Sequence, residues 1–188
     1  ADATEQKLPL SAKALLREAS SLELEAKTVA PLQDAVSGNE AGAVQDALEK
    51  SSALVAHAKR ALAVADVIRQ ATALGQGTSL ITFEGTMWEN RRVDEQLPVG
   101  AANPLRIART AVPGEHEPVA LNLFNVTDHE LLVRVQVGPL TNGVVVTSHR
   151  SVGVPTSLGE VSWDPLPELD ETATLVIPSL ASRELWLD

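Results

Sequence analysis

Several residue types are missing or rare in this sequence. It contains no cysteine and no tyrosine, and only two phenylalanines and three tryptophans in 188 residues. Without cysteine the chain has no disulfide, no thiolate metal ligand and no thiol nucleophile. Because aromatic residues make up only 3% of the chain, its core has to be aliphatic. So few rings also exclude a broad stacking platform for sugars or single-stranded RNA.

Two further absences narrow the range of partners. No apolar run approaches the roughly 20 residues that a membrane-spanning helix needs, so we expect no membrane insertion. The net charge is −10, and phosphate binding requires clustered Lys and Arg. We therefore expect no nucleic-acid partner. A signal-peptide pattern is also absent, and the opening Ala1–Asp2–Ala3 fits either the cleaved end of an exported protein or an arbitrary starting point within a longer one.

The composition changes along the chain. All five lysines precede residue 60, and alanine is dense through residue 73. After that point Val, Thr, Pro and Gly take over. This change predicts an α+β fold with two parts, an antiparallel helical hairpin over residues 1–77 and an antiparallel β-sandwich over residues 78–188.

The first part has helical periodicity. Apolar residues recur three and four positions apart between Ser11 and Ala35, which is typical of one face of a helix. A second such pattern runs from Ala47 to Ile68 and ends before Gly75–Gly77, a natural helix terminus. Ser37–Asn39 predicts the turn between them. The paired residues expected to be buried in the seam between the helices are Leu15, Leu22, Val55 and Leu62.

From Ser79 onward the period of the apolar residues changes to two. Residues 131–137 alternate cleanly, which predicts a strand with Val133 and Val135 inside and Arg134 and Gln136 in water. About seven short strands separated by turn residues favour a sandwich, with a closed barrel as the alternative. The other predicted strands are Leu80–Glu84, Leu105–Val112, Pro118–Val126, Val144–His149, Thr174–Ile177 and Glu184–Leu187. Leu121 and Leu123 are also expected to face inward, and the abrupt end of the last strand suggests a piece of a longer protein.

No residue pattern predicts catalysis, a metal or a cofactor. The four histidines lack His-Glu-x-x-His spacing, and Glu115–His116–Glu117 alternates between faces if it is extended. There is no Gly-x-Ser-x-Gly motif and no phosphate-binding loop. Carboxylates gather near Trp88 and Trp163, but neither group has a spacing that selects the geometry of glycoside hydrolysis. We therefore expect no catalytic residue.

The three tryptophans are the remaining candidates for binding. The candidates for carbohydrate binding are Trp88, with its neighbours Glu89 and Asn90, and Trp163. Trp186 alternates with Leu185 and Leu187, so it should face away from their core. That position makes Trp186 a candidate for contact with a neighbouring domain.

Short motifs in the second part carry a resemblance to a known family. A Gly-Glu-x-Glu-Pro turn introduces a strand, an Asn-x-Thr turn follows, and Leu132–Val135 alternates as the next strand. The later segments Asp164–Pro167, Ile177–Pro178 and Leu185–Leu187 fit the same pattern. Residues from about 103 to 188 resemble the N-terminal-type β-sandwich of large bacterial glycoside-hydrolase-like proteins, relatives of β-N-acetylgalactosaminidases.

The resemblance implies a non-catalytic accessory module of an exported, carbohydrate-active bacterial protein, periplasmic or extracellular. In that family the catalytic carboxylates belong to a barrel that this sequence does not include, so none is carried over. The resemblance offers no role for the helical hairpin. Two alternatives stay open: an assembly module that docks a protein partner through the hairpin or strand edges, and an enzyme that uses the carboxylates near Trp88 or Trp163.

Overall fold

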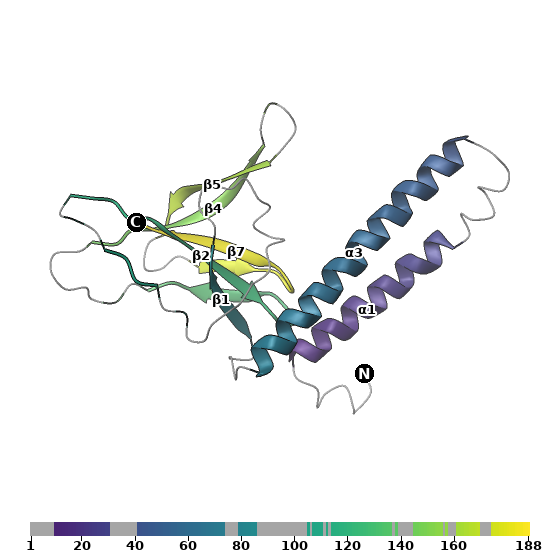
Figure 1. Ribbon diagram of the computed structural model, residues 1–188, viewed down its shortest axis with the longest axis horizontal. Coiled ribbons are helices and arrows are strands. Elements are labelled where there is room, and N and C mark those ends of the chain that lie inside the picture. Colours follow the sequence, from purple (N-terminus) through teal and green to yellow (C-terminus); the bar gives the residue numbers. More distant parts are fainter. Residues whose placement is uncertain are drawn as a thin grey trace.

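The computed structural model describes residues 10–30, 41–73, 79–85, 105, 107–110, 112, 114–136, 138, 145–155, 157, 161–169 and 174–188. Two helices come first, α1 (Leu10–Val29) and α3 (Ala41–Ala73). They lie side by side as a hairpin, and their far ends point away from the strands (Figure 1). The helical hairpin followed by antiparallel sheets confirms the predicted α+β class.

The strands form two antiparallel sheets. The larger one has the order β1-β2-β7-β4-β5, and the smaller one pairs β3 with β6. Their bounds are β1 (Leu80–Glu84), β2 (Val119–Asn125), β3 (Leu131–Arg134), β4 (Ser148–Pro155), β5 (Val161–Glu168), β6 (Thr174–Ile177) and β7 (Ser182–Leu187). Ile177 and Leu185 are central to the cluster that packs one sheet on the other. Leu123 is buried there, and Leu121, Val133 and Val135 pack against it.

The outward positions on β3 and just after it agree with the sequence, since Arg134 and Gln136 are exposed. Some strand limits do not. The segment Leu105–Val112 was predicted as a strand, but its described residues are not in one. The alternation of apolar residues is short, since Leu105 and Ile107 are followed by Arg109 at the position where the next apolar residue is expected. The prediction of Val144–His149 is also shifted, since β4 begins at Ser148.

The opposite face of the larger sheet holds the base of the hairpin. Phe124 and Ile81 lie in one cluster with Val64 and Ile68 of α3 and Ala14 of α1. The other members of this cluster are Val67, Phe83, Val126 and Leu180. Helices and sheet therefore share a hydrophobic core. The predicted division into 1–77 and 78–188 stays a prediction, and its boundary lies outside the described residues.

Polar contacts reinforce this junction. The Arg17 guanidinium donates to the carbonyl of Asp128 at 2.8 Å and forms an ion pair with its carboxylate at 3.2 Å. Arg60 donates to the carbonyl of Leu180 at 3.0 Å. Each arginine thus ties one helix of the hairpin to a turn of the β part.

The seam between the helices differs from the predicted one. Leu15 and Leu22 of α1 are half-buried, as are Leu54 and Ala61 of α3, but Val55 is 53% exposed and Leu62 is 73% exposed. The prediction was therefore wrong for these two side chains. Apolar residues occur in adjacent pairs on α3, so periodicity alone does not select the buried member of each pair.

The packing of α3 on the sheet determines which member of each apolar pair is buried. Val64 is among the most buried residues of the chain. Leu62 precedes it by two positions, which is about 200° around a helix. Burying Val64 against the strands therefore turns Leu62 outward.

The Asn125–Thr127 segment is a structural turn, as the sequence indicated. The side-chain Oδ1 of Asn125 accepts from the Thr127 N–H at 2.8 Å and from the Thr127 hydroxyl at 2.7 Å. The Asn125 amide donates to the carbonyls of His129 at 2.7 Å and Ile177 at 3.0 Å. Asn125-Val126-Thr127 also has the Asn-x-Thr pattern of a glycosylation site, but both Asn125 and Thr127 are fully buried and present no surface for a glycan.

Candidate functional site

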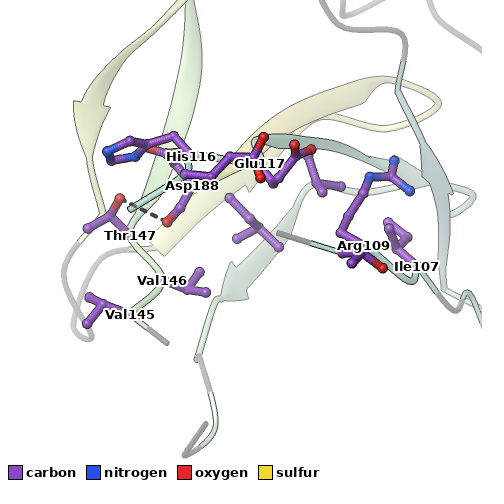
Figure 2. Close-up of a pocket in the computed structure, with 12 residues that line it drawn as sticks. Ile107, Arg109, His116, Glu117, Val145, Val146, Thr147 and Asp188 are labelled. Carbon is purple, nitrogen blue, oxygen red and sulfur yellow. Dashed lines mark hydrogen bonds and ion pairs between the residues drawn. The ribbon is translucent and has the colours of Figure 1, made fainter. Parts of the chain in front are cut away.

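An open cleft of about 820 Å³ lies at one end of the strands (Figure 2). Its apolar wall combines Val119 of β2 and Leu187 of β7 with Ile107, Val145 and Val146. Polar side chains complete the lining, namely Arg109, Thr110, Glu115, His116, Glu117, Thr147 and Asp188. A cavity of this volume with a mixed lining is the usual size for a small-molecule site.

Local backbone structure positions this lining. Gly114 adopts a φ of 86°, in the region that glycine enters without strain. The bend lets the Glu115 N–H donate to the carbonyl of Val112 at 3.0 Å, and the Glu115 carboxylate accepts from the Val112 N–H at 2.9 Å. On the other side, Thr147 and Asp188 exchange backbone hydrogen bonds of 2.7 and 3.0 Å.

The charged groups of the cleft are already partly paired. An Arg109 nitrogen forms an ion pair with the carboxylate of Glu84. The His116 Nδ1 lies 3.2 Å from the Asp188 carboxylate. Glu115 and Glu117 add two more carboxylates, so the lining carries net negative charge. Such a cleft favours neutral or cationic ligands over anions.

The His116–Asp188 pair of the cleft is open to solvent. The His116 side chain is 82% exposed and that of Asp188 is 36% exposed. Within the part of the chain that the structure describes, no three His, Cys, Asp or Glu side chains are grouped to hold a metal ion.

A buried polar network crosses the larger sheet, and the sequence patterns missed it. Glu184 of β7 is buried, and its Oε1 accepts from the Ser151 hydroxyl and the Trp186 indole N–H, each at 2.7 Å. Gly85 lies against this network, since a Cβ there would fall 2.6 Å from the Asn122 amide nitrogen. These two hydrogen bonds join β4 to β7 inside the sheet, which is a structural role.

The predicted site residues are not brought together by described contacts. Trp88, Glu89 and Asn90 lie outside the described residues. Trp163 is placed only by its backbone, in β5 opposite Gly153. Trp186 does face away from Leu185 and Leu187, as expected, but it is only 8% exposed. Most of its surface already contacts this chain, and its role at an interface stays a prediction.

A second polar cluster lies between the helices. The His57 Nε2 is 2.7 Å from Glu18, and its Nδ1 is 2.9 Å from both carboxylate oxygens of Glu25. The hydrogen bond to Glu25, followed by that to Glu18, raises the pKa of His57 above its ordinary value, against the opposing effect of burial. The two ring nitrogens point to different carboxylates, so the cluster cannot converge on one metal.

Sequence reasoning missed this cluster because it sought partners for His57 on the same helix. The carboxylates lie 39 and 32 residues earlier, on α1. A signal was present, since Glu18 and Glu25 are seven residues apart and therefore share a helix face.

The hairpin also presents an exposed apolar stripe on α3, defined by Leu48, Val55 and Leu62. Their exposed fractions are 61%, 53% and 73%. All fully buried helical residues lie near the sheet, and none of the described side chains of 15–30 and 42–63 is fully buried. Neither described helix combines the length and apolar character needed to cross a membrane.

Comparison with known proteins leaves the resemblance without support. No protein-family model matches the chain, and the searches of curated proteins and of solved structures found no match either. The kinship with glycoside-hydrolase-like sandwiches therefore stays a hypothesis based on short motifs.

Proposed function

We propose that this chain is a non-catalytic interaction module that docks a protein partner through its helical hairpin. The observation that carries this proposal is the α3 stripe of Leu48, Val55 and Leu62, which stays exposed while the base of the hairpin is fixed on the sheet. The sheet thus acts as a support, and the hairpin is the element offered to a partner.

The energetics favour a partner for this stripe. Burying a Leu or Val side chain contributes about 1.5–3 kcal/mol relative to leaving it in water. Isolated helices are marginal in water, and most helical stability in proteins comes from packing of an apolar face. A partner that covers the stripe therefore stabilises both the complex and the outer part of the hairpin.

Site-specific photo-crosslinking in cells that make the protein tests this proposal. A photoreactive amino acid replaces Leu62 in one variant and Ala53 in the control. Ala53 is exposed and lies about 160° around the helix from Val55. We expect a discrete adduct from position 62 and none from position 53. Equal labelling at both positions, or no adduct at position 62, would contradict docking through the stripe.

The cleft favours a second candidate, the binding of a small neutral or cationic ligand. With the motif resemblance, this becomes an accessory module of an exported, periplasmic or extracellular carbohydrate-active protein. Support comes from the mixed lining, with hydroxyls and carboxylates beside an aliphatic wall. Here too the chain itself has no catalytic role.

The second candidate has two versions, a module that binds sugar directly in the cleft and a module that only supports another domain. Calorimetric titration with oligosaccharides distinguishes them. Direct sugar binding in the cleft predicts saturable heat that is lost in Glu117→Gln. A purely supporting module predicts no heat, and Trp88→Ala then leaves folding and titration unchanged. Saturable heat lost in Trp88→Ala but kept in Glu117→Gln would move the site from the cleft to the predicted tryptophan segment.

A further inference from the structure

We infer that the partner of the α3 stripe is a second copy of this chain, bound in antiparallel orientation about a two-fold axis at Val55. This inference rests on the proposed docking function and specifies its partner. It predicts a four-helix assembly in which two hairpins meet along their α3 helices.

The spacing of the stripe is self-complementary. Leu48 and Leu62 lie seven residues before and seven residues after Val55. A two-fold axis at Val55 therefore places Leu48 of each copy against Leu62 of the other. A two-fold interface uses the same patch on both subunits, and this patch satisfies that requirement without any other surface.

The surface beside Val55 has the shape that receives a helix. A shallow hollow is bordered by Ser52, Val55, Ala56 and Lys59, with Ser51 at its edge. The first four positions have the spacing i, i+3, i+4 and i+7, which is the set that forms a hole in knobs-into-holes packing. The small side chains of Ser52 and Ala56 leave room for a knob. The hollow is centred next to Val55, so Val55 of the second copy is the knob that the symmetry supplies.

Charge selects the antiparallel orientation. Between Val44 and Leu62, Lys59 is the only charged residue within about 60° of the stripe. A parallel pair would place the two Lys59 side chains next to each other. An antiparallel pair places each Lys59 opposite Ser51 and Ser52 of the other copy, which removes this like-charge contact.

The overall shape accommodates the antiparallel orientation. The sheets sit at one end of the hairpin, and the other end points away from them (Figure 1). In an antiparallel pair the two β parts lie at opposite ends of the helical assembly. In a parallel pair both β parts would lie at the same end.

Sedimentation equilibrium of the whole chain, from micromolar to about 0.5 mM, tests the inference. Three large apolar side chains per copy make a small interface, so we expect association on the order of micromolar. Val55→Glu places two like charges at the axis and should weaken association at least about tenfold. Ala53→Glu, on the opposite side of the helix, should leave it unchanged. Circular dichroism checks that both variants remain folded, which their exposed positions allow.

Cysteine pairing tests the orientation, because the natural chain has no cysteine. A mixture of Leu48→Cys and Leu62→Cys chains should form a mixed disulfide on mild oxidation, and Leu48→Cys alone should not. A disulfide from Leu48→Cys alone would overturn the antiparallel arrangement. A strict monomer at 0.5 mM, or a dimer insensitive to Val55→Glu, would overturn self-association.

The photo-crosslinking experiment described above distinguishes two negative outcomes: that the partner is not a second copy, and that the stripe does not dock a partner at all. An adduct of two chains at position 62 supports the second copy. A different protein captured there, with a monomeric chain, overturns the second copy and leaves docking through the stripe intact. Absence of any adduct together with a monomeric chain overturns both.

Discussion

At the scale of single residues, His57 is held between two carboxylates of the other helix. Both of its ring nitrogens face oxygens, at 2.7 Å from Glu18 and 2.9 Å from Glu25. Only the imidazolium can donate from both nitrogens, since the neutral ring has one donor and one acceptor. The full contact between the helices therefore depends on the protonated form.

This contact predicts a pH-dependent contribution to stability. The pKa of His57 is raised in the folded chain. Its contribution is therefore fully present below the unfolded pKa of about 6.5 and is lost as pH rises through the higher folded pKa. We expect His57→Gln to lower the free energy of unfolding more near pH 5.5 than near pH 8.5, as measured by urea denaturation of both proteins. An equal loss at both pH values would show that the ring acts only by packing.

A second residue-scale prediction concerns Gly85. A Cβ at this position would lie 2.6 Å from the Asn122 amide nitrogen and 3.1 Å from Glu184 Oε2. We expect Gly85→Ala to reduce the free energy of unfolding by about 1–3 kcal/mol, since overpacking forces the buried network to move. Gly138→Ala is the control, because nothing lies within 4 Å of a Cβ there. Equal stabilities of the two variants in denaturant titrations would refute the close approach.

At the scale of elements, the sequence predicted what depends on local periodicity. The two helices and β1, β2, β3 and β6 follow their alternation or helical spacing. The strand β5 was missed because Pro165 and Pro167 interrupt it. Its place at the edge of the described sheet explains how it tolerates them, since an edge strand can leave backbone positions without N–H donors.

Features that depend on distant residues were not predictable in the same way. Choosing the buried member of each apolar pair on α3 required knowing where Val64 contacts the sheet. Finding the carboxylates around His57 required pairing the two helices in register. The Glu184 network required the order of strands in the sheet. The cleft combines three separate loop segments, and no single stretch of sequence describes it.

The orientation of α3 yields a prediction at this scale. Ile68 is buried in the shared cluster, so Ile68→Ala should lower the free energy of unfolding by about 2–4 kcal/mol. Leu62→Ala should change it by less than about 0.5 kcal/mol in the isolated chain, because the side chain is mostly exposed. Chemical denaturation at low protein concentration measures both. A larger effect at Leu62 than at Ile68 would restore the seam predicted from the sequence.

At the scale of the whole molecule, the shared core couples the helices to the strands. Val64 and Val67 come from α3, whereas Ile81, Phe83 and Phe124 come from the larger sheet. Neither part can lose this cluster without exposing apolar surface of the other. A common core of this kind favours one cooperative unfolding transition over two independent ones.

The distribution of tryptophan makes this coupling measurable. All three tryptophans follow residue 78, so their fluorescence reports only on the β part. Circular dichroism at 222 nm reports mainly on the helices. We expect Val64→Ala, a change within α3, to lower the denaturation midpoint by the same amount with both probes. The loss should be about 2 kcal/mol, from two buried methyl groups and the cavity they leave. Leu62→Ala is the matched control, since it alters an exposed position two residues away. If tryptophan fluorescence were unchanged by Val64→Ala while the helical signal shifted, the hairpin and the sheets would unfold independently, and the division at residues 77 and 78 would then mark two true domains.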